Sequence, residues 1–339
     1  SAAFIGIIGG SVALVIGIPF NATTIYTLIR TKKLHNITYF LMGYICVCDL
    51  TLSSFSIPIV IIADVSKKWI FGQLFCEYFS FINNNLVGIQ LQTLLLVSLN
   101  RCFLMCLPNV NQVLFSKMGL TILSMLTFIL STFVLFWPLP RLWGRYGYSP
   151  LKNSCTFLDI GDGFTAFATM MAFGFPITGI VICYSCIFIK VRNHQRNISN
   201  RLHLNELKNP HKDLNDHEAP KQEGQLKKQK KSSFNKELKM TKMMVAVIGL
   251  YILCYMPIMF TLAIDKNVKA PAMHRLGVVL VWSYGILNNI IFLRMNSLFR
   301  DAYFTQFEIL RCRKYCQVTG TDIDGQSQTQ SVTQAVSHQ

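Results

Sequence analysis

The sequence predicts an all-α membrane protein, a seven-transmembrane-helix bundle followed by a short C-terminal amphipathic surface helix. Three observations predict this fold class. The 339 residues are 52% hydrophobic and only 14% charged, whereas a soluble domain carries about 25% charged residues. The apolar residues gather in long runs, and a helix that crosses a bilayer needs about 20 of them. Lys and Arg lie between these runs and not within them.

Seven apolar runs are long enough to cross a bilayer. They cover residues 4–29, 38–62, 75–98, 118–138, 164–189, 243–264 and 276–293. The first run is longer than the core of a signal peptide and has no basic leader, so we interpret it as a span. A soluble protein with seven core helices is the alternative, but such uniform lengths with so few internal charges are rare outside membranes.

The remaining segments suggest one membrane domain, residues 1–307, and a tail. Residues 193–235 are polar and rich in charge, so we expect a mostly disordered third loop. Residues 294–307 place aromatic and basic side chains at helical spacing, which predicts the surface helix. Residues 308–339 read as a disordered tail.

The distribution of positive charge predicts the orientation in the membrane. Most of the 32 Lys and Arg residues follow the first, third, fifth and seventh spans. Because cytosolic segments are enriched in these residues, we expect a multi-pass plasma-membrane protein with its N-terminus extracellular and its C-terminus cytosolic. The net charge of +16 then faces anionic lipid. Nucleic acid is not an expected partner, since no stacking aromatics interleave the basic run.

Two pairs of cysteines stand out under this topology. Cys76 and Cys155 alone fall on the oxidising side, which predicts a disulfide. Cys312 and Cys316 follow the surface helix, where palmitoylation or plain reduced thiols are both open interpretations.

Several short motifs follow one another in a characteristic order, and Arg101 follows Cys76 at a characteristic spacing. They include Asn21 in the first span, "CDLTLSSFSIP" with Asp49, "WIFGQLFC", "CYMP" and "NNIIF". In this order the chain resembles the rhodopsin-like (class A) family of G-protein-coupled receptors. Asn100 before Arg101, the loop "WGRYGYSPLKNSCTF" and Asn289 in place of a proline resemble the melatonin-receptor branch and the related insect receptors moody and trapped-in-endoderm.

The resemblance implies a switch at the cytosolic end of the bundle. Arg101 would pair with Glu237 at rest, and breaking the pair would let the sixth span move outward and admit a heterotrimeric G protein. Asn100 lacks the charge of the family's aspartate. Phe292 lacks the hydroxyl that would join Tyr184 in the active state.

Asp49 is the one carboxylate that we place deep inside a span. We expect Asn21 and Asn288 to be its partners, and in the family such a cluster holds sodium. Gln90 and Tyr284 depart from the family pattern at two neighbouring positions, so sodium binding at Asp49 is doubtful and no cofactor is expected.

The resemblance also restricts the chemical class of the expected ligand. Amine receptors need an aspartate where this chain has Asn83, and opsins need a lysine where it has Trp282. An apolar pocket without a buried charge remains, suited to a neutral or amphiphilic small molecule or a lipid. Its expected lining is Asn83, Val87, Thr169, Tyr255, Ile258, Met259, Leu262, His274, Val278 and Trp282. His274 could instead be a solvated loop residue, and Ile258 and Met259 plain packing.

Three other functions compete with G-protein activation. A scavenger or arrestin-biased receptor is motivated by Asn100, Tyr255 and Phe292, and by Ser and Thr residues that phosphorylation could prepare for arrestin. A transporter or channel should show charged relays or paired broken helices, which the sequence lacks. An enzyme is least expected, because no metal-ligand cluster or nucleophile–base pair stands out.

Overall fold

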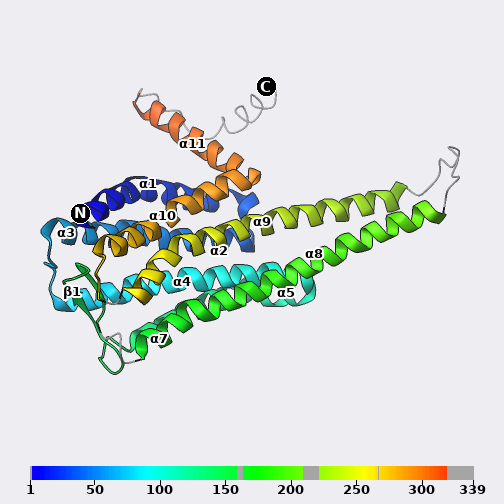
Figure 1. Ribbon diagram of the computed structural model, residues 1–339. Helices are drawn as coiled ribbons and strands as arrows, with labels where there is room; N and C mark the ends of the chain where they lie inside the picture. Colours follow the sequence, from blue (N-terminus) through cyan, green and yellow to red (C-terminus); the bar gives the residue numbers. More distant parts are fainter. Residues whose placement is uncertain (1, 159–162, 209–220, 266, 319–339) are drawn as a thin grey trace.

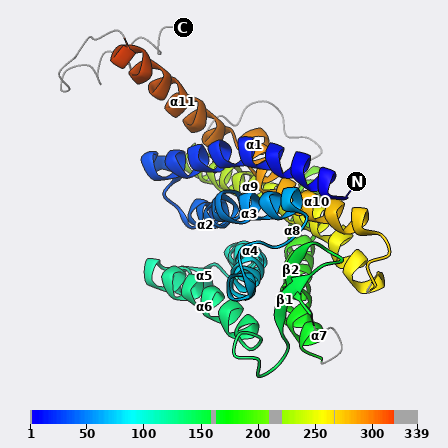
Figure 2. The ribbon, with the colours of Figure 1, turned by 90° about the vertical axis from the view of Figure 1, so that its left-hand side faces the viewer.

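The computed structural model describes residues 2–158, 163–208, 221–265 and 267–318. Within them, seven helices are long and apolar enough to cross a membrane, so the predicted fold class is confirmed. Figures 1 and 2 show these helices packed side by side as one bundle. A two-stranded hairpin lies at one end, here called the hairpin end, and α8 and α9 project beyond the other.

The seven spans use nine labelled helices, because two spans are interrupted. The spans are Ala2–Arg30 (α1), Ile37–Thr51 with Ile57–Ser66 (α2 and α3), Gln73–Cys106 (α4), Lys117–Phe136 (α6), Phe164–Thr169 with Phe175–Lys208 (α7 and α8), Lys221–Ile264 (α9) and Pro271–Met295 (α10). Each interruption is a π-helical turn just before a proline, Pro58 or Pro176. Proline has no N–H to donate, so the regular ladder is lost there.

Shorter elements join the spans. They are Pro108–Leu114 (α5), the strands Tyr146–Ser149 (β1) and Ser154–Phe157 (β2), and Ser297–Val318 (α11). β1 and β2 pair antiparallel, with Tyr148 opposite Cys155. Asn36 and Ser116 cap α2 and α6 by accepting the backbone N–H groups of Tyr39 and Gly119.

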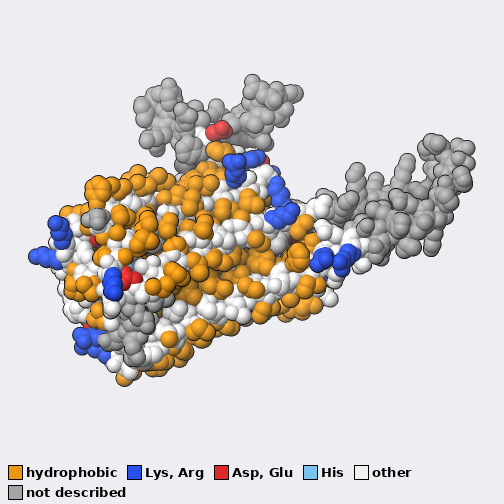
Figure 3. Space-filling view, in the orientation of Figure 1, with side chains coloured by type: hydrophobic (Ala, Val, Ile, Leu, Met, Phe, Trp, Pro, Cys, Tyr) orange, Lys and Arg blue, Asp and Glu red, His pale blue; other side chains and the backbone are white. Residues whose placement is uncertain are grey.

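Large apolar side chains cover the flank of the bundle, and Figure 3 shows Lys and Arg gathered at its two ends. Val15, Phe133 and Leu253 are 68%, 59% and 71% exposed. Such side chains would be unfavourable in water but suit contact with lipid hydrocarbon. The interior holds one large hydrophobic cluster that includes Met42, Leu94 and Tyr251.

Three boundaries differ from the sequence-based expectation. The backbone is helical through Lys208 and again from Lys221, where a mostly disordered loop was expected over 193–235. α11 continues to Val318, beyond the expected start of the tail at 308. These stretches are rich in Leu, Lys, Gln and Glu, which favour helix even without a buried face. Residues 209–220 and 319–339 lie outside the described residues.

Candidate functional site

The end of the bundle opposite the hairpin contains an ion pair between α4 and α9. Nη1 of Arg101 donates to Oε2 of Glu237 at 2.7 Å. The Arg101 side chain is 5% exposed and that of Glu237 is 37% exposed. This is the pair that the resemblance implies, and it ties the base of α9 to the end of α4.

Asn100 precedes Arg101 and forms its hydrogen bond with α5 and not with α9. Its Nδ2 donates to Oδ1 of Asn111 at 3.0 Å, and both residues are buried. Asn111 lies on α5, so Asn100 attaches the short helix to α4 and supplies no charge to Arg101. The sequence identified the missing charge but not this partner.

A chain of hydrogen bonds crosses the middle of the bundle. Nε2 of Gln90 on α4 donates to Oδ1 of Asp49 on α2 at 2.6 Å. Oη of Tyr255 on α9 donates to Oε1 of the same Gln90 at 3.0 Å. Gln90 is completely buried, and Asp49 and Tyr255 are 4% and 3% exposed. One amide therefore connects three spans, which the sequence did not reveal.

The expected Asn21–Asp49–Asn288 cluster is only partly formed. The neighbouring residue Asn289, at the position of the family's proline, donates to Oδ1 of Asn21 at 2.8 Å and accepts from Thr24 at 2.7 Å. Among the described residues, both polar atoms of Asn288 and Oδ2 of Asp49 are buried without a hydrogen-bond partner. Such groups usually bind buried water. Asn289 therefore joins α10 to α1 through Asn21 and Thr24, and the role of Asn288 as a partner of Asp49 stays a prediction.

Three tyrosines pack around the Gln90 chain. The rings of Tyr251 and Tyr255 stack with centroids 4.0 Å apart, and Tyr284 meets Tyr251 edge to face at 5.1 Å. Phe292, one of the expected switch residues, is fully buried and packs edge to face on Phe299 of α11. Aromatic contacts therefore join α9 to α10 and α10 to α11.

The structure does not gather the ten expected ligand-lining residues around one centre. Trp282 packs in a cluster with Ala13 and Ile57, with Val278 beside it, whereas Tyr255 belongs to the central core. Thr169 is exposed, and its place in the lining stays a prediction. The helix is interrupted directly after Thr169, which sequence periodicity cannot locate.

The remaining expected lining residues divide into two groups. Ile258 is buried, and a side chain in place of Gly277 on α10 would meet it at 2.9 Å, so Ile258 packs between α9 and α10. Asn83, Val87, Met259 and Leu262 are partly buried. Val87 packs against the core cluster that contains Tyr255, and all four remain candidates for ligand contact.

A buried pair of charges lies between α3 and α10, close to the hairpin. Nη2 of Arg275 on α10 donates to Oδ1 of Asp64 on α3 at 2.6 Å, with side chains 5% and 0% exposed. The sequence placed both residues in loops, because the apolar runs end at 62 and begin at 276. The helices continue past these limits and bring the two charges together, so that each compensates the desolvation of the other.

The hairpin closes over this ion pair. Asn153, in the left-handed conformation at φ 47°, donates through Nδ2 to the carbonyl of Ala63 at 3.0 Å and to Asp64 at 3.2 Å. Arg275 also donates to the carbonyl of Lys152 at 3.2 Å. A side chain in place of Gly6 on α1 would clash with Asp64 and Arg275, so α1 covers the pair from the side.

Two further contacts hold the hairpin on its other side. Cys76 and Cys155 form the predicted disulfide between α4 and β2. Oη of the buried Tyr146 donates to the carbonyl of Leu135 on α6 at 2.9 Å, and burial raises the pKa of Tyr146 above its usual range. Nη2 of Arg141, in the segment between α6 and β1, pairs with Glu77 on α4 at 3.0 Å.

The loop between α9 and α10 is organised by Asp265. Its two oxygens accept the backbone N–H groups of Lys269 at 2.7 Å and Ala270 at 2.8 Å. These bonds, and then the nearby His274, hold the pKa of Asp265 below its usual value. Nε2 of His274 lies 3.3 Å from the carboxylate, and His274 is only 5% exposed, so it is not a solvated loop residue.

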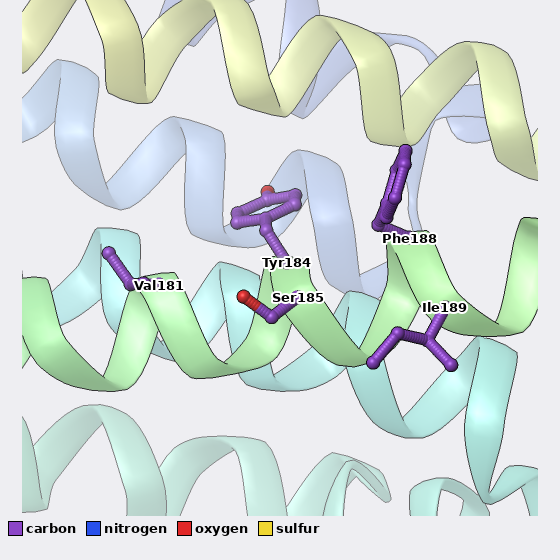
Figure 4. A pocket seen from close by; sticks show the side chains of 5 residues that line it. All are labelled: Val181, Tyr184, Ser185, Phe188 and Ile189. Atoms are coloured by element: carbon purple, nitrogen blue, oxygen red, sulfur yellow. The ribbon is translucent and has the colours of Figure 1, made fainter.

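A shallow groove of about 480 Å³ opens on the outer face of α8, lined by Val181, Tyr184, Ser185, Phe188 and Ile189. Figure 4 shows Tyr184 and Phe188 directed toward α9, whereas Ile189 points the other way. Tyr184, an expected switch residue, therefore lies at the boundary between the interior and the membrane-facing surface. The side chains of Cys312 and Cys316, the expected palmitoylation sites, lie outside those that the structure describes.

Comparisons with known proteins identify the family of this chain. The sequence pattern of the seven-transmembrane receptors of the rhodopsin family matches residues 20–293. Protein trapped in endoderm-1 of Drosophila melanogaster is 26% identical over 317 residues, 92% of this chain and 79% of that protein. The G-protein coupled receptor moody of the same fly is 23% identical over 86% of this chain, which spans about half of moody.

A solved structure shows the same fold. The crystal structure of squid rhodopsin superposes with a TM-score of 0.75 at 22% identity, covering 96% of this chain and 92% of the rhodopsin. At this identity the likeness establishes the fold alone. The family match covers most of the chain, and the chain therefore belongs to the rhodopsin family of seven-transmembrane, G-protein-coupled receptors and is not an enzyme.

Proposed function

We propose that this receptor responds to an extracellular, neutral or amphiphilic small molecule and activates a heterotrimeric G protein by releasing Arg101 from Glu237. The carrying observation is the ion pair of 2.7 Å between α4 and α9. One partner is nearly buried and the other is partly exposed, so the pair can be opened without burying a second unpaired charge. A packed interface with two arrangements is the type of element that a ligand can bias.

The orientation is part of the proposal. The hairpin end would be extracellular, because it contains the disulfide, which forms in oxidising compartments. The opposite end would be cytosolic, because most of the basic residues follow the spans that end there.

The ligand class follows from the residues around Tyr255. Asn83 replaces the acidic residue that an amine would need, and the buried charges at the hairpin end already neutralise each other. A ligand with a charged group would have to separate Asp64 from Arg275. A neutral ligand would not, and it could hydrogen-bond to Asn83 while its apolar part meets Val87, Met259 and Leu262.

The test measures nucleotide exchange on a purified G protein by the receptor in nanodiscs, without ligand. Glu237→Gln should raise the exchange rate, and Arg101→Ala should lower it to background. Arg300→Ala is the matched control, since Arg300 belongs to an exposed pair with Asp301 at 3.5 Å. Exchange that is unchanged in Glu237→Gln and retained in Arg101→Ala would contradict the proposal. Normal ligand uptake without exchange on any G protein would favour a scavenger.

A further inference from the structure

Asp49 is a buried carboxylate with no positively charged partner among the described residues within hydrogen-bond reach. The family implies a sodium ion at such a position. On the Oδ1 side of Asp49 the residues present do not fit the ion, because the group that contacts this oxygen is the amide nitrogen of Gln90, a hydrogen-bond donor, at 2.6 Å, whereas Oδ2 has no partner among the described residues. A cation needs oxygen lone pairs, and a bound NH₂ group turns its positive end toward the same space.

The oxygen of the Gln90 amide is also hydrogen-bonded. Oε1 of Gln90 accepts from Tyr255 at 3.0 Å, so the one oxygen of Gln90 that could bind a cation is directed toward α9. Gln90 is completely buried and lies between α2 and α9. Both its donor and its acceptor are therefore used to join two different spans.

We propose that Gln90 is a positioning residue that takes the place of a cation at Asp49 and, through Tyr255, holds α9 in its resting position. Moving α9 outward would break the bond of Tyr255 to Gln90 and leave a buried amide oxygen without a donor, which is unfavourable. The inference goes beyond the proposed function, because it concerns ion dependence and the middle of the bundle instead of the Arg101 pair.

The first experiment needs neither ligand nor G protein. Thermal unfolding of the purified full chain is compared in sodium chloride and in choline chloride of equal concentration. The wild type should have the same Tm in both salts. Gln90→Ser replaces the amide by a small hydroxyl and frees Asp49, so sodium should raise its Tm by about 2–4 °C. Asp49→Asn combined with Gln90→Ser should lose this rise. A sodium-dependent rise in the wild type, or none in folded Gln90→Ser, would overturn the proposal.

The second experiment tests the connection to α9. A fluorescent probe at the base of α9 reports its distance from α4 in the wild type and in variants. Tyr255→Phe and Gln90→Met should each increase the outward population, and the double variant should add little, because both remove the same bond between Tyr255 and Gln90. Tyr284→Phe is the matched control, since its hydroxyl is buried without a hydrogen-bond partner among the described residues. An outward shift in the control equal to that of Tyr255→Phe would overturn the proposal.

Discussion

The ion pair between Asp64 and Arg275 gives the strongest prediction about stability. Arg275→Met removes one charge from a pair whose side chains are 5% and 0% exposed and leaves the Asp64 carboxylate buried. Breaking a buried pair in this way costs about 3–5 kcal/mol, because the remaining charge has lost its compensation. The variant also removes the donor to the carbonyl of Lys152, so the hairpin turn is loosened as well.

The matched control is Arg141→Met. Arg141 also pairs with a carboxylate, that of Glu77, but its side chain is 58% exposed. The Glu77 side chain is only 9% exposed, but the exposed arginine lets water and salt screen the pair, and Gln73 still donates to Glu77 at 3.0 Å when Arg141 is replaced, so we expect a cost of about 0–1 kcal/mol. The same chemical change should therefore cost roughly 3 kcal/mol less at Arg141 than at Arg275.

The assay is thermal unfolding of the purified chain at one scan rate, since the unfolding of membrane proteins is often irreversible. At about 2 °C per kcal/mol, Arg275→Met should lower Tm by about 6–10 °C, whereas Arg141→Met should change it by less than about 2 °C. Asp64→Leu combined with Arg275→Met should recover most of the loss, because it removes both charges. Equal Tm values for the two single arginine variants would refute the argument that burial makes the Asp64 pair important.

Three further predictions follow from other contacts. Asn289→Leu should destabilise the chain by about 1–3 kcal/mol, measured by thermal unfolding, because Asn21 and Thr24 lose their partner; a neutral effect would mean that water replaces the amide. Asn100→Leu should speed hydrogen exchange in α5, since Asn111 loses its bond to α4, and unchanged exchange would show that packing alone holds α5. Asp265 has a lowered pKa, so its contribution is present above the unfolded value of about 4 and is lost as the pH falls through the folded value. The protection factors of the Lys269 and Ala270 amides, which compare exchange with the intrinsic rate at the same pH, should therefore fall in acid, and Asp265→Asn should make these factors independent of pH; the same acid dependence in that variant would contradict this assignment.

The sequence predicted the seven spans well because the period and length of apolar runs are local properties. It also predicted the disulfide, since the topology left two cysteines on one side. The resemblance to the rhodopsin-like family implied that Arg101 would pair with Glu237, and the structure brings the two side chains within 2.7 Å.

What it missed depends on contacts between distant segments. Asp64 and Arg275 lie just outside apolar runs, so a hydropathy window assigns them to loops, yet each helix continues for another turn. A carboxylate and an arginine at the same end of two spans are a signal that could have suggested the pair. Gln90 was recognised as a departure from the family, but its two hydrogen bonds depend on the spacing of α2, α4 and α9. Asn289 was noted as a missing proline, and the bonds that its side chain makes could not be inferred from that absence.

The hairpin is held on one side by the disulfide between Cys76 and Cys155. On the other side it is held by the hydrogen bonds of Asn153 and Arg275 around the buried ion pair. A reducing agent breaks only the disulfide, so the hydrogen bonds of Asn153 to α3 would remain after treatment with a thiol. High salt alone would not release the hairpin either, because the ion pair between Asp64 and Arg275 is buried away from the solvent. To detach the hairpin from the bundle, an experiment therefore has to reduce the disulfide and disrupt the buried ion pair in the same sample.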